Sequence, residues 1–143
     1  MERAIEAGTE AGNRGEIPVG AVVLAPEGQI IAIEGNRREE LKDPSAHAEI
    51  RALRAASAAL DSSHCDGCTL VVTLEPCTMC AGAIQLARIK QVVFGAWEPK
   101  TGACGSQRDV LRDQRATHQV QVRGGVRKAQ CEALLKGFFA ALR

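Results

Sequence analysis

Two short segments of this chain carry side chains that together could bind a metal ion and transfer a proton. The first is His47-Ala48-Glu49, and the second is Pro76-Cys77-Thr78-Met79-Cys80. Imidazole and thiolates are typical zinc ligands, and a catalytic zinc keeps its fourth tetrahedral position open for water, whereas a structural zinc normally has four protein ligands. These residue types therefore predict one catalytic zinc ion per chain, bound by His47, Cys77 and Cys80.

Glu49 is the candidate for proton transfer. It follows His47 by two positions, so on a helix the two side chains differ in direction by about 200°, and Glu49 is expected beside the ion and not on it. Zinc lowers the pKa of a bound water to about 7, and a nearby carboxylate can accept its proton and deliver it to a ring nitrogen and then to a leaving amine. The predicted reaction is hydrolytic deamination.

The cysteines also allow two other interpretations of this site. A redox-active pair of Cys77 and Cys80 would leave the imidazole and the carboxylate without a role. A structural zinc bound by four cysteines would add Cys65 and Cys68, but only eight residues separate Cys68 from Cys77, against roughly 15–20 in the usual pattern. We prefer the three-ligand interpretation, because it gives a role to the imidazole, both thiolates and the carboxylate.

We interpret the remaining thiols and imidazoles as residues outside this metal site. Cys65 and Cys68 lie in Asp/Ser/Gly-rich loop sequence, and we interpret them as free thiols, with a second metal site as the alternative. We expect packing roles for Cys104 and Cys131 and an ordinary hydrogen-bonded side chain for His118.

Length and composition set the broad class. With 143 residues, 45% of them apolar and 24% charged, the chain fits a single domain over 1–143 with a core that needs no disulfides. It has no apolar run long enough to cross a membrane, and its N-terminus lacks the features of a secretory signal. We therefore expect a cytoplasmic protein whose six cysteines are thiols or metal ligands.

The net charge of +1 conceals an asymmetry along the chain. Residues 1–87 contain 7 Lys/Arg and 13 Asp/Glu, whereas residues 88–143 contain 11 and 4. Lys and Arg neutralise phosphates and release their counterions, so the basic half could bind a nucleic-acid backbone. The alternative is a charge-balanced surface over which folding scatters these residues.

Hydrophobic periodicity and turn residues predict the elements that position the two segments. We expect a helix over 2–13, a hairpin of strands 19–24 and 29–33, a helix over 46–60 that follows Asp43-Pro44-Ser45, and a buried strand over 69–74. A helix from Pro76 to about Ala87 would follow, with a parallel strand over 91–94 after a right-handed crossover. His47, Glu49, Cys77 and Cys80 would then lie in the first turns of two helices, where the helix dipole favours thiolate.

The last third of the chain carries weaker signals. We expect a polar Gly-rich loop over 98–106, a short helix over 108–113, a strand over 118–123 and a final helix over 126–143.

The chain resembles the bacterial tRNA-specific adenosine deaminases, within the wider cytidine and deoxycytidylate deaminase superfamily. The zinc motif H-x-E…P-C-x-x-C is a known signature of zinc-dependent deaminases. The resemblance covers nearly the whole chain, in the segments Ile17-Pro18-Val19-Gly20-Ala21, Gly35-Asn36-Arg37, 43–50, 74–83, 92–96, Lys100-Thr101-Gly102-Ala103 and Phe138-Phe139.

This resemblance implies a three-layer α/β/α fold around a five-stranded mixed sheet, a homodimer, and conversion of the wobble adenosine in a tRNA anticodon loop to inosine. It implies zinc binding by His47, Cys77 and Cys80 and proton transfer by Glu49. It further implies substrate contacts from the Asn36 side chain, the Ala48 backbone N–H and the Pro76 backbone carbonyl, although Asn36 also fits a turn after a strand.

Two features bear on the substrate. Trp97-Glu98-Pro99 departs from the family pattern in a loop that approaches a flanking nucleotide. Aromatic residues are scarce, so base stacking would depend on Trp97, Phe138 or Phe139, any of which could instead belong to the core. The alternatives are a deaminase of a free nucleobase or nucleoside (guanine, cytosine, adenine or cytidine) and a non-catalytic RNA-binding protein with a structural zinc; Glu49 distinguishes the enzyme from the latter.

Overall fold

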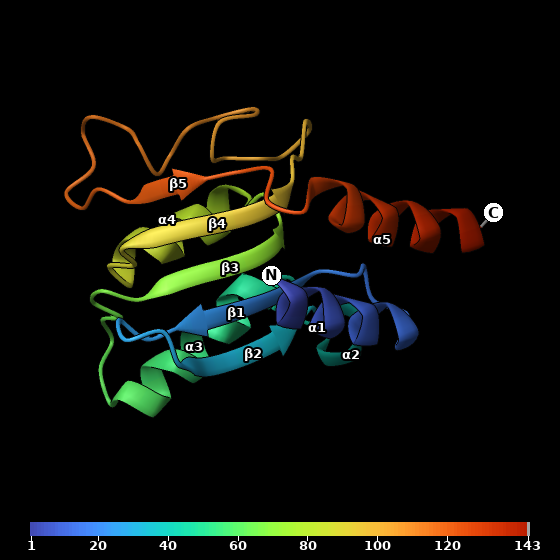
Figure 1. The fold of residues 1–143 in the computed structure, drawn as a ribbon, viewed down its shortest axis with the longest axis horizontal. Helices are drawn as coiled ribbons and strands as arrows, with labels where there is room; N and C mark the ends of the chain where they lie inside the picture. Colours follow the sequence, from blue (N-terminus) through green and yellow to red (C-terminus); the bar gives the residue numbers. More distant parts are fainter. Residues whose placement is uncertain (143) are drawn as a thin grey trace.

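The computed structural model describes residues 1–142, and its centre is a five-stranded sheet in the order β2-β1-β3-β4-β5 (Figure 1). The strands are β1 (Gly20–Leu24), β2 (Ile30–Gly35), β3 (Thr69–Leu74), β4 (Gln91–Ala96) and β5 (Gln121–Arg123). The helices are α1 (Glu2–Asn13), α2 (Arg38–Leu41), α3 (Ala48–Leu60), α4 (Thr78–Leu86) and α5 (Lys128–Ala141). The four-residue α2 was not predicted from the sequence.

The sheet is mixed, as predicted. β1 pairs antiparallel with both β2 and β3, whereas β3, β4 and β5 run parallel to one another. The first two strands form the predicted hairpin, and the β3-α4-β4 unit carries the two cysteines of the second segment. Because β3 and β4 are parallel, the loops that follow them emerge at the same edge of the sheet.

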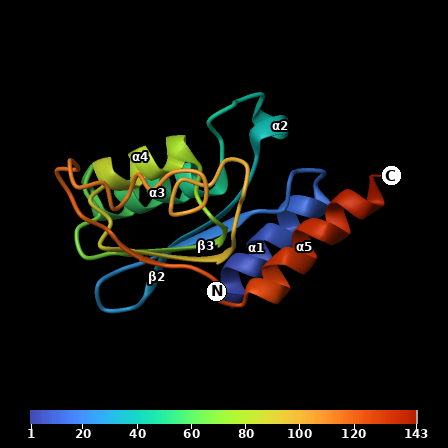
Figure 2. The same ribbon diagram turned by 90° about the horizontal axis from the view of Figure 1, so that it is seen from above.

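Helices cover both faces of the sheet (Figure 2). α1 and α5 contact each other and the sheet on one side, whereas α3 and α4 lie together on the other. Alternation along the strands explains both interfaces, because Val22 and Val71 pack beneath α1 while Val23 and Val72 belong to the larger core under α3 and α4. The predicted three-layer α/β/α fold is confirmed.

Close backbone contact brings α5 onto the sheet. A Cβ built at Gly95 in β4 would lie 2.2 Å from Cys131 Sγ, so only glycine lets the helix come this close. Cys131 is buried at this contact, which confirms its packing role. The position of α5 matters for the site because this helix reaches the pocket described below.

The last third of the chain differs from the prediction. The predicted helix over 108–113 is wrong, because N–H groups here bond to other loops: Val110 N–H to the Ala103 carbonyl, and Gly105 N–H to the Arg108 carbonyl. The predicted strand over 118–123 is limited to Gln121–Arg123, and the last helix covers Lys128–Ala141. Arg143, the predicted end of that helix, lies outside the described residues.

Across residues 1–142, none of the helices combines the length and the apolarity that a bilayer span requires.

Candidate metal centre and active-site pocket

The predicted zinc ligands lie at the N-termini of two neighbouring helices. His47 is the N-cap of α3 and Cys77 the N-cap of α4, both with extended backbone conformations, and Cys80 lies in the first turn of α4. Each helix thus begins two residues later than predicted, at Ala48 and at Thr78. Because α3 packs against α4, two sequence segments 30 residues apart meet at one point.

The ligand separations fit a tetrahedral zinc ion. His47 Nδ1 lies 3.7 Å from Cys77 Sγ and 3.5 Å from Cys80 Sγ. With Zn–N near 2.05 Å and Zn–S near 2.3 Å, a tetrahedral ion would separate nitrogen from sulfur by about 3.6 Å. Among residues 1–142, this is the one group of three or more His, Cys, Asp or Glu side chains arranged to hold a metal.

The protonation of the two thiols also fits a cation between them. A hydrogen bond from Cys80 lowers the pKa of Cys77 to about 4, while the same hydrogen bond and burial raise the pKa of Cys80. A hydrogen bond with Cys77 raises the pKa of His47. A dication between the two sulfur atoms would stabilise both as thiolates.

Glu49 lies in the first turn of α3 and is 4% exposed. Burial raises the pKa of its carboxyl group, as expected for a charged group that is removed from water. The side chain lines the same cavity as His47 and Cys77. A buried carboxyl group beside a metal centre suits repeated proton uptake and release.

The cavity has a volume of about 420 Å³ and collects residues from distant parts of the chain. Its fourteen lining residues are Ile17, Val19, Asn36, Arg38, His47, Ala48, Glu49, Leu74, Glu75, Cys77, Glu98, Thr101, Leu135 and Phe139. This volume and mixture of apolar walls with a few polar groups is typical of a small-ligand site. Sequence reasoning missed the apolar wall from Ile17, Val19, Leu74 and Leu135, because no local pattern separates these residues from ordinary core residues.

Of the predicted substrate contacts, Asn36 is also used inside the protein. Its Nδ2 donates to the Ile17 carbonyl at 3.2 Å, and its Oδ1 accepts from the Arg38 N–H at 3.1 Å. An asparagine side chain has two N–H donors and two acceptor positions, so one of each remains for a ligand. Asn36 therefore serves as the turn residue allowed for above and still lines the cavity.

The two backbone groups predicted to contact the substrate differ in whether they already have hydrogen-bond partners within the protein. Ala48 is the first residue of α3, where N–H groups have no partner within the helix. The Pro76 carbonyl, in contrast, already accepts a hydrogen bond from Ala103 N–H at 2.8 Å and a long one from the Cys104 thiol at 4.0 Å.

Glu75 is a second buried carboxylate that the sequence reasoning did not single out. It is 2% exposed and accepts hydrogen bonds from the backbone N–H groups of Glu98, Cys104 and Ser106, each at 3.0 Å, and from the Ser106 hydroxyl. A Cβ at Gly102 would lie 2.4 Å from this carboxylate, so the loop closes tightly around it. Glu75 thus holds the 98–106 loop against the Cys77 segment. The sequence feature that could have indicated this role is a charged residue at the end of a buried strand.

The aromatic residues are divided between core and cavity. Trp97 packs edge-on against buried Phe94, with ring centroids 4.7 Å apart, and does not line the cavity. Phe139 lines it and is 44% exposed, and the Phe138 ring packs edge-on against it with centroids 5.4 Å apart. In the loop that departs from the family pattern, Glu98 is the residue that reaches the cavity.

The other cysteines and His118 do not line this cavity. Cys65 and Cys68 are free, fully buried thiols in the larger core, and Cys65 Sγ lies 3.6 Å from Ser57 Oγ. They are not grouped with Cys77 and Cys80, so the four-cysteine interpretation is wrong for the described residues. Cys104 is also buried in this core, as predicted. His118 Nε2 lies 2.7 Å from the Ile89 carbonyl, which confirms the ordinary hydrogen bond expected of it.

Comparison with known proteins agrees with this site. Residues 1–96 match the model of the cytidine and deoxycytidylate deaminase zinc-binding region. The tRNA-specific adenosine deaminase of Bacillus subtilis is 43% identical over 143 residues, which is all of this chain and 88% of that protein.

Two solved structures are similar along nearly their whole length. One comes from studies of A-to-I editing by tRNA:A34 deaminases at the wobble position; its TM-score is 0.91 at 42% identity, covering 94% of this chain and 97% of that one. The other is the guanine deaminase of Nitrosomonas europaea, with a TM-score of 0.84 at 26% identity, covering 97% and 82%. From its zinc motif, its fold and these similarities, we conclude that the chain belongs to the cytidine and deoxycytidylate deaminase family, on the branch of the tRNA-specific adenosine deaminases.

Proposed function

We propose that this protein is a zinc-dependent hydrolase that deaminates the wobble adenosine of a tRNA anticodon loop to inosine and releases ammonia. The observation that carries the proposal is the three-ligand cluster beside buried Glu49 at the base of a cavity, in a chain similar over its full length to tRNA-specific adenosine deaminases. A loop nucleotide is an accessible substrate, because its base can be splayed out at low cost.

His47, Cys77 and Cys80 would hold the zinc ion, which when bound supplies an activated water for attack on the amino-bearing carbon. Glu49 would accept one proton of that water and donate it to the ring nitrogen next to that carbon. It would then carry the second proton, from the hydroxyl added to the carbon, to the amine, which leaves as ammonia while the carbonyl forms. The free N–H of Ala48 and the Pro76 carbonyl orient the base edge. Asn36 uses its free amide donor and acceptor positions in the same way, and Phe139 offers an aromatic surface at the cavity wall.

A homodimer is part of this proposal. The outer surface of α3 and α4 carries a shallow apolar depression that includes Ile50, Met79, Ala83 and Leu86, and Leu86 is 80% exposed. Exposed apolar surface of this kind is typical of an interface. We expect sedimentation to give a dimer, Leu86→Glu to give a monomer, and the exposed Leu142→Glu control to leave the dimer intact; a monomeric wild-type protein would contradict the dimer.

We further place the protein in the cytoplasm with one zinc ion per chain. All six cysteines are free, and five of them are buried, which suits a reducing compartment. Metal analysis of the purified protein tests the stoichiometry.

The similarity to a guanine deaminase favours a free nucleobase as the second candidate substrate. The deciding experiment incubates zinc-loaded protein with an anticodon stem-loop carrying adenosine at the wobble position, and separately with guanine, adenine, cytosine and cytidine. Inosine in the stem-loop supports the tRNA proposal. Ammonia from a free base alone would overturn it in favour of the second candidate.

A further inference from the structure

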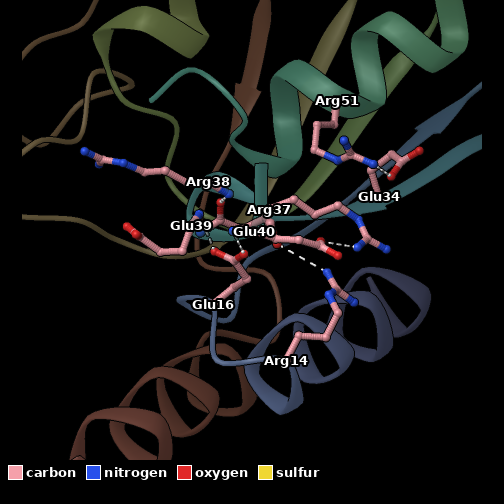
Figure 3. Close-up of polar contacts among 9 residues, drawn as sticks. Arg14, Glu16, Glu34, Arg37, Arg38, Glu39, Glu40 and Arg51 are labelled. Carbon is pink, nitrogen blue, oxygen red and sulfur yellow. Dashed lines mark hydrogen bonds and ion pairs between the residues drawn. The ribbon is translucent and has the colours of Figure 1, made fainter. Parts of the chain in front are cut away.

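Four arginines lie near one another in the region of α2, and three of them are engaged within the protein (Figure 3). Arg14 Nη2 donates to the Asn36 carbonyl at 3.2 Å, Arg51 pairs with Glu34 at 2.9 Å, and Arg37 pairs with Glu40. The guanidinium of Arg38 has neither an ion pair nor a hydrogen bond among residues 1–142, and in Figure 3 it extends away from this network. Arg38 is exposed and lines the cavity.

The backbone that carries Arg38 is held firmly. Its N–H donates to Asn36 Oδ1 at 3.1 Å. The next two N–H groups, of Glu39 and Glu40, donate to the two carboxylate oxygens of Glu16 at 3.0 and 2.9 Å, and Glu16 is 2% exposed. A buried carboxylate thus anchors α2, and the same Asn36 amide that faces the cavity fixes the start of this turn. The result is a free cation on a rigid support.

Arg38 differs in charge from the other residues that line the cavity. The basic half of the chain contributes Glu98, Thr101, Leu135 and Phe139 to the lining, none of which is basic. Of the fourteen lining residues, Arg38 is the one permanent cation, and it comes from the acidic half. If the substrate is a nucleotide, its phosphates have no other cationic partner in this lining.

We propose that Arg38 forms a phosphate subsite that binds a phosphodiester flanking the nucleotide whose base enters the cavity. This inference rests on the proposed function, because it assigns the backbone contact of that substrate. A guanidinium binds phosphate oxygens through paired N–H donors, and its rigid support reduces the entropy lost on binding. Arg38 then favours a nucleotide within RNA over a free base or nucleoside, because only the former brings a phosphate to the rim.

The test compares Arg38→Ala with Arg3→Ala, a matched control that removes one exposed, ion-paired arginine of α1 outside the cavity lining. We expect Arg38→Ala to raise KM for the anticodon stem-loop about tenfold, the lower end of what a charge-assisted hydrogen bond contributes, with kcat nearly unchanged. The slope of log affinity against log salt should fall by about 0.7 to 1. Arg3→Ala should change neither quantity.

A second arm identifies the phosphate. Stem-loops carrying a neutral methylphosphonate at either phosphate flanking the target nucleotide should bind wild type more weakly, and at one of these positions Arg38→Ala should cause no further loss.

Equal effects of Arg38→Ala on all substrates, or the same effect as Arg3→Ala, would overturn the subsite. Absence of inosine with wild type would instead contradict the proposed function. If wild type then deaminates only free nucleosides, a comparison of adenosine with its 5′-phosphate decides whether Arg38 binds a phosphomonoester; equal KM values there would also overturn the subsite.

Discussion

The chain contains two Cys-x-x-Cys segments of identical spacing with opposite properties. Cys77 and Cys80 lie at the N-terminus of α4 beside His47, and Cys77 lines a cavity, whereas Cys65 and Cys68 lie in a turn that is packed into the core. A hydrogen bond from Cys80 lowers the pKa of Cys77 to about 4, whereas burial raises the pKa of Cys68. Spacing alone therefore does not make a metal site.

The physical difference lies in what surrounds each pair. The first pair has a helix N-terminus, whose N–H groups stabilise thiolate, and an imidazole from a second helix. The second pair is bridged by a backbone hydrogen bond from Cys68 N–H to the Cys65 carbonyl, and the partner of Cys65 Sγ is the Ser57 hydroxyl. A third ligand and a stabilised negative charge distinguish a binding pair from a packing pair.

The largest expected effect comes from breaking the first pair. Cys80→Ala should reduce bound zinc from about one ion per chain to a trace and abolish deamination, because two ligands hold zinc far less well than three. Treatment of wild type with a strong chelator should have the same effect, reversed by added zinc. Metal analysis and an inosine assay measure both; full zinc content in Cys80→Ala would contradict the assigned ligands.

Glu49→Gln should separate metal binding from catalysis within the same site. The amide keeps the shape of the side chain but cannot accept and return a proton, so kcat should fall by about 10²–10⁴-fold. Zinc content should match wild type, in contrast with Cys80→Ala. Wild-type kcat in this variant would remove Glu49 from the mechanism.

Glu75→Ala should show that the site of Cys77 and Cys80 depends on the 98–106 loop, which Glu75 holds in place. Cys65 and Cys68 have no such support. Three backbone N–H groups of the 98–106 loop would lose their shared acceptor, which should lower the free energy of unfolding by about 1–3 kcal/mol. We expect retained zinc and kcat/KM lowered by about tenfold, because Glu98 and Thr101 of this loop line the cavity. Denaturant titration and kinetics on the same sample test this, with Ser106→Ala as the milder control.

The second pair should have the smallest effect on activity. Cys68→Ala removes a fully buried sulfur from the core, so we expect a stability loss of about 1–2 kcal/mol with unchanged zinc content and kcat. The urea midpoint and the zinc content provide the two measurements. Loss of zinc in Cys68→Ala would show that both pairs bind metal and would remove the contrast between them.

Much of the fold could be predicted because its signals are local. Apolar β-branched runs identified β1 to β4, the turn residues identified the hairpin, and Pro76 after a buried strand indicated a helix start close to the observed one. Prediction failed over 108–113, where charged residues suggested a helix but the N–H groups find partners in the preceding loop. That competition depends on long-range packing, which no local pattern records.

By itself, the sequence determined the chemistry: one imidazole, two thiolates and a carboxylate in two motifs, each preceding or beginning a helix. Only the tertiary structure decided which thiols share a site, since contact between α3 and α4 brings His47 to Cys77 and Cys80. It also decided that α5 lines the cavity, that Glu75 holds a loop, and that the Arg38 guanidinium has no partner among residues 1–142. The reason is that residue type and spacing are properties of neighbours in the chain, whereas burial, charge compensation and cavity walls arise between segments that meet only on folding.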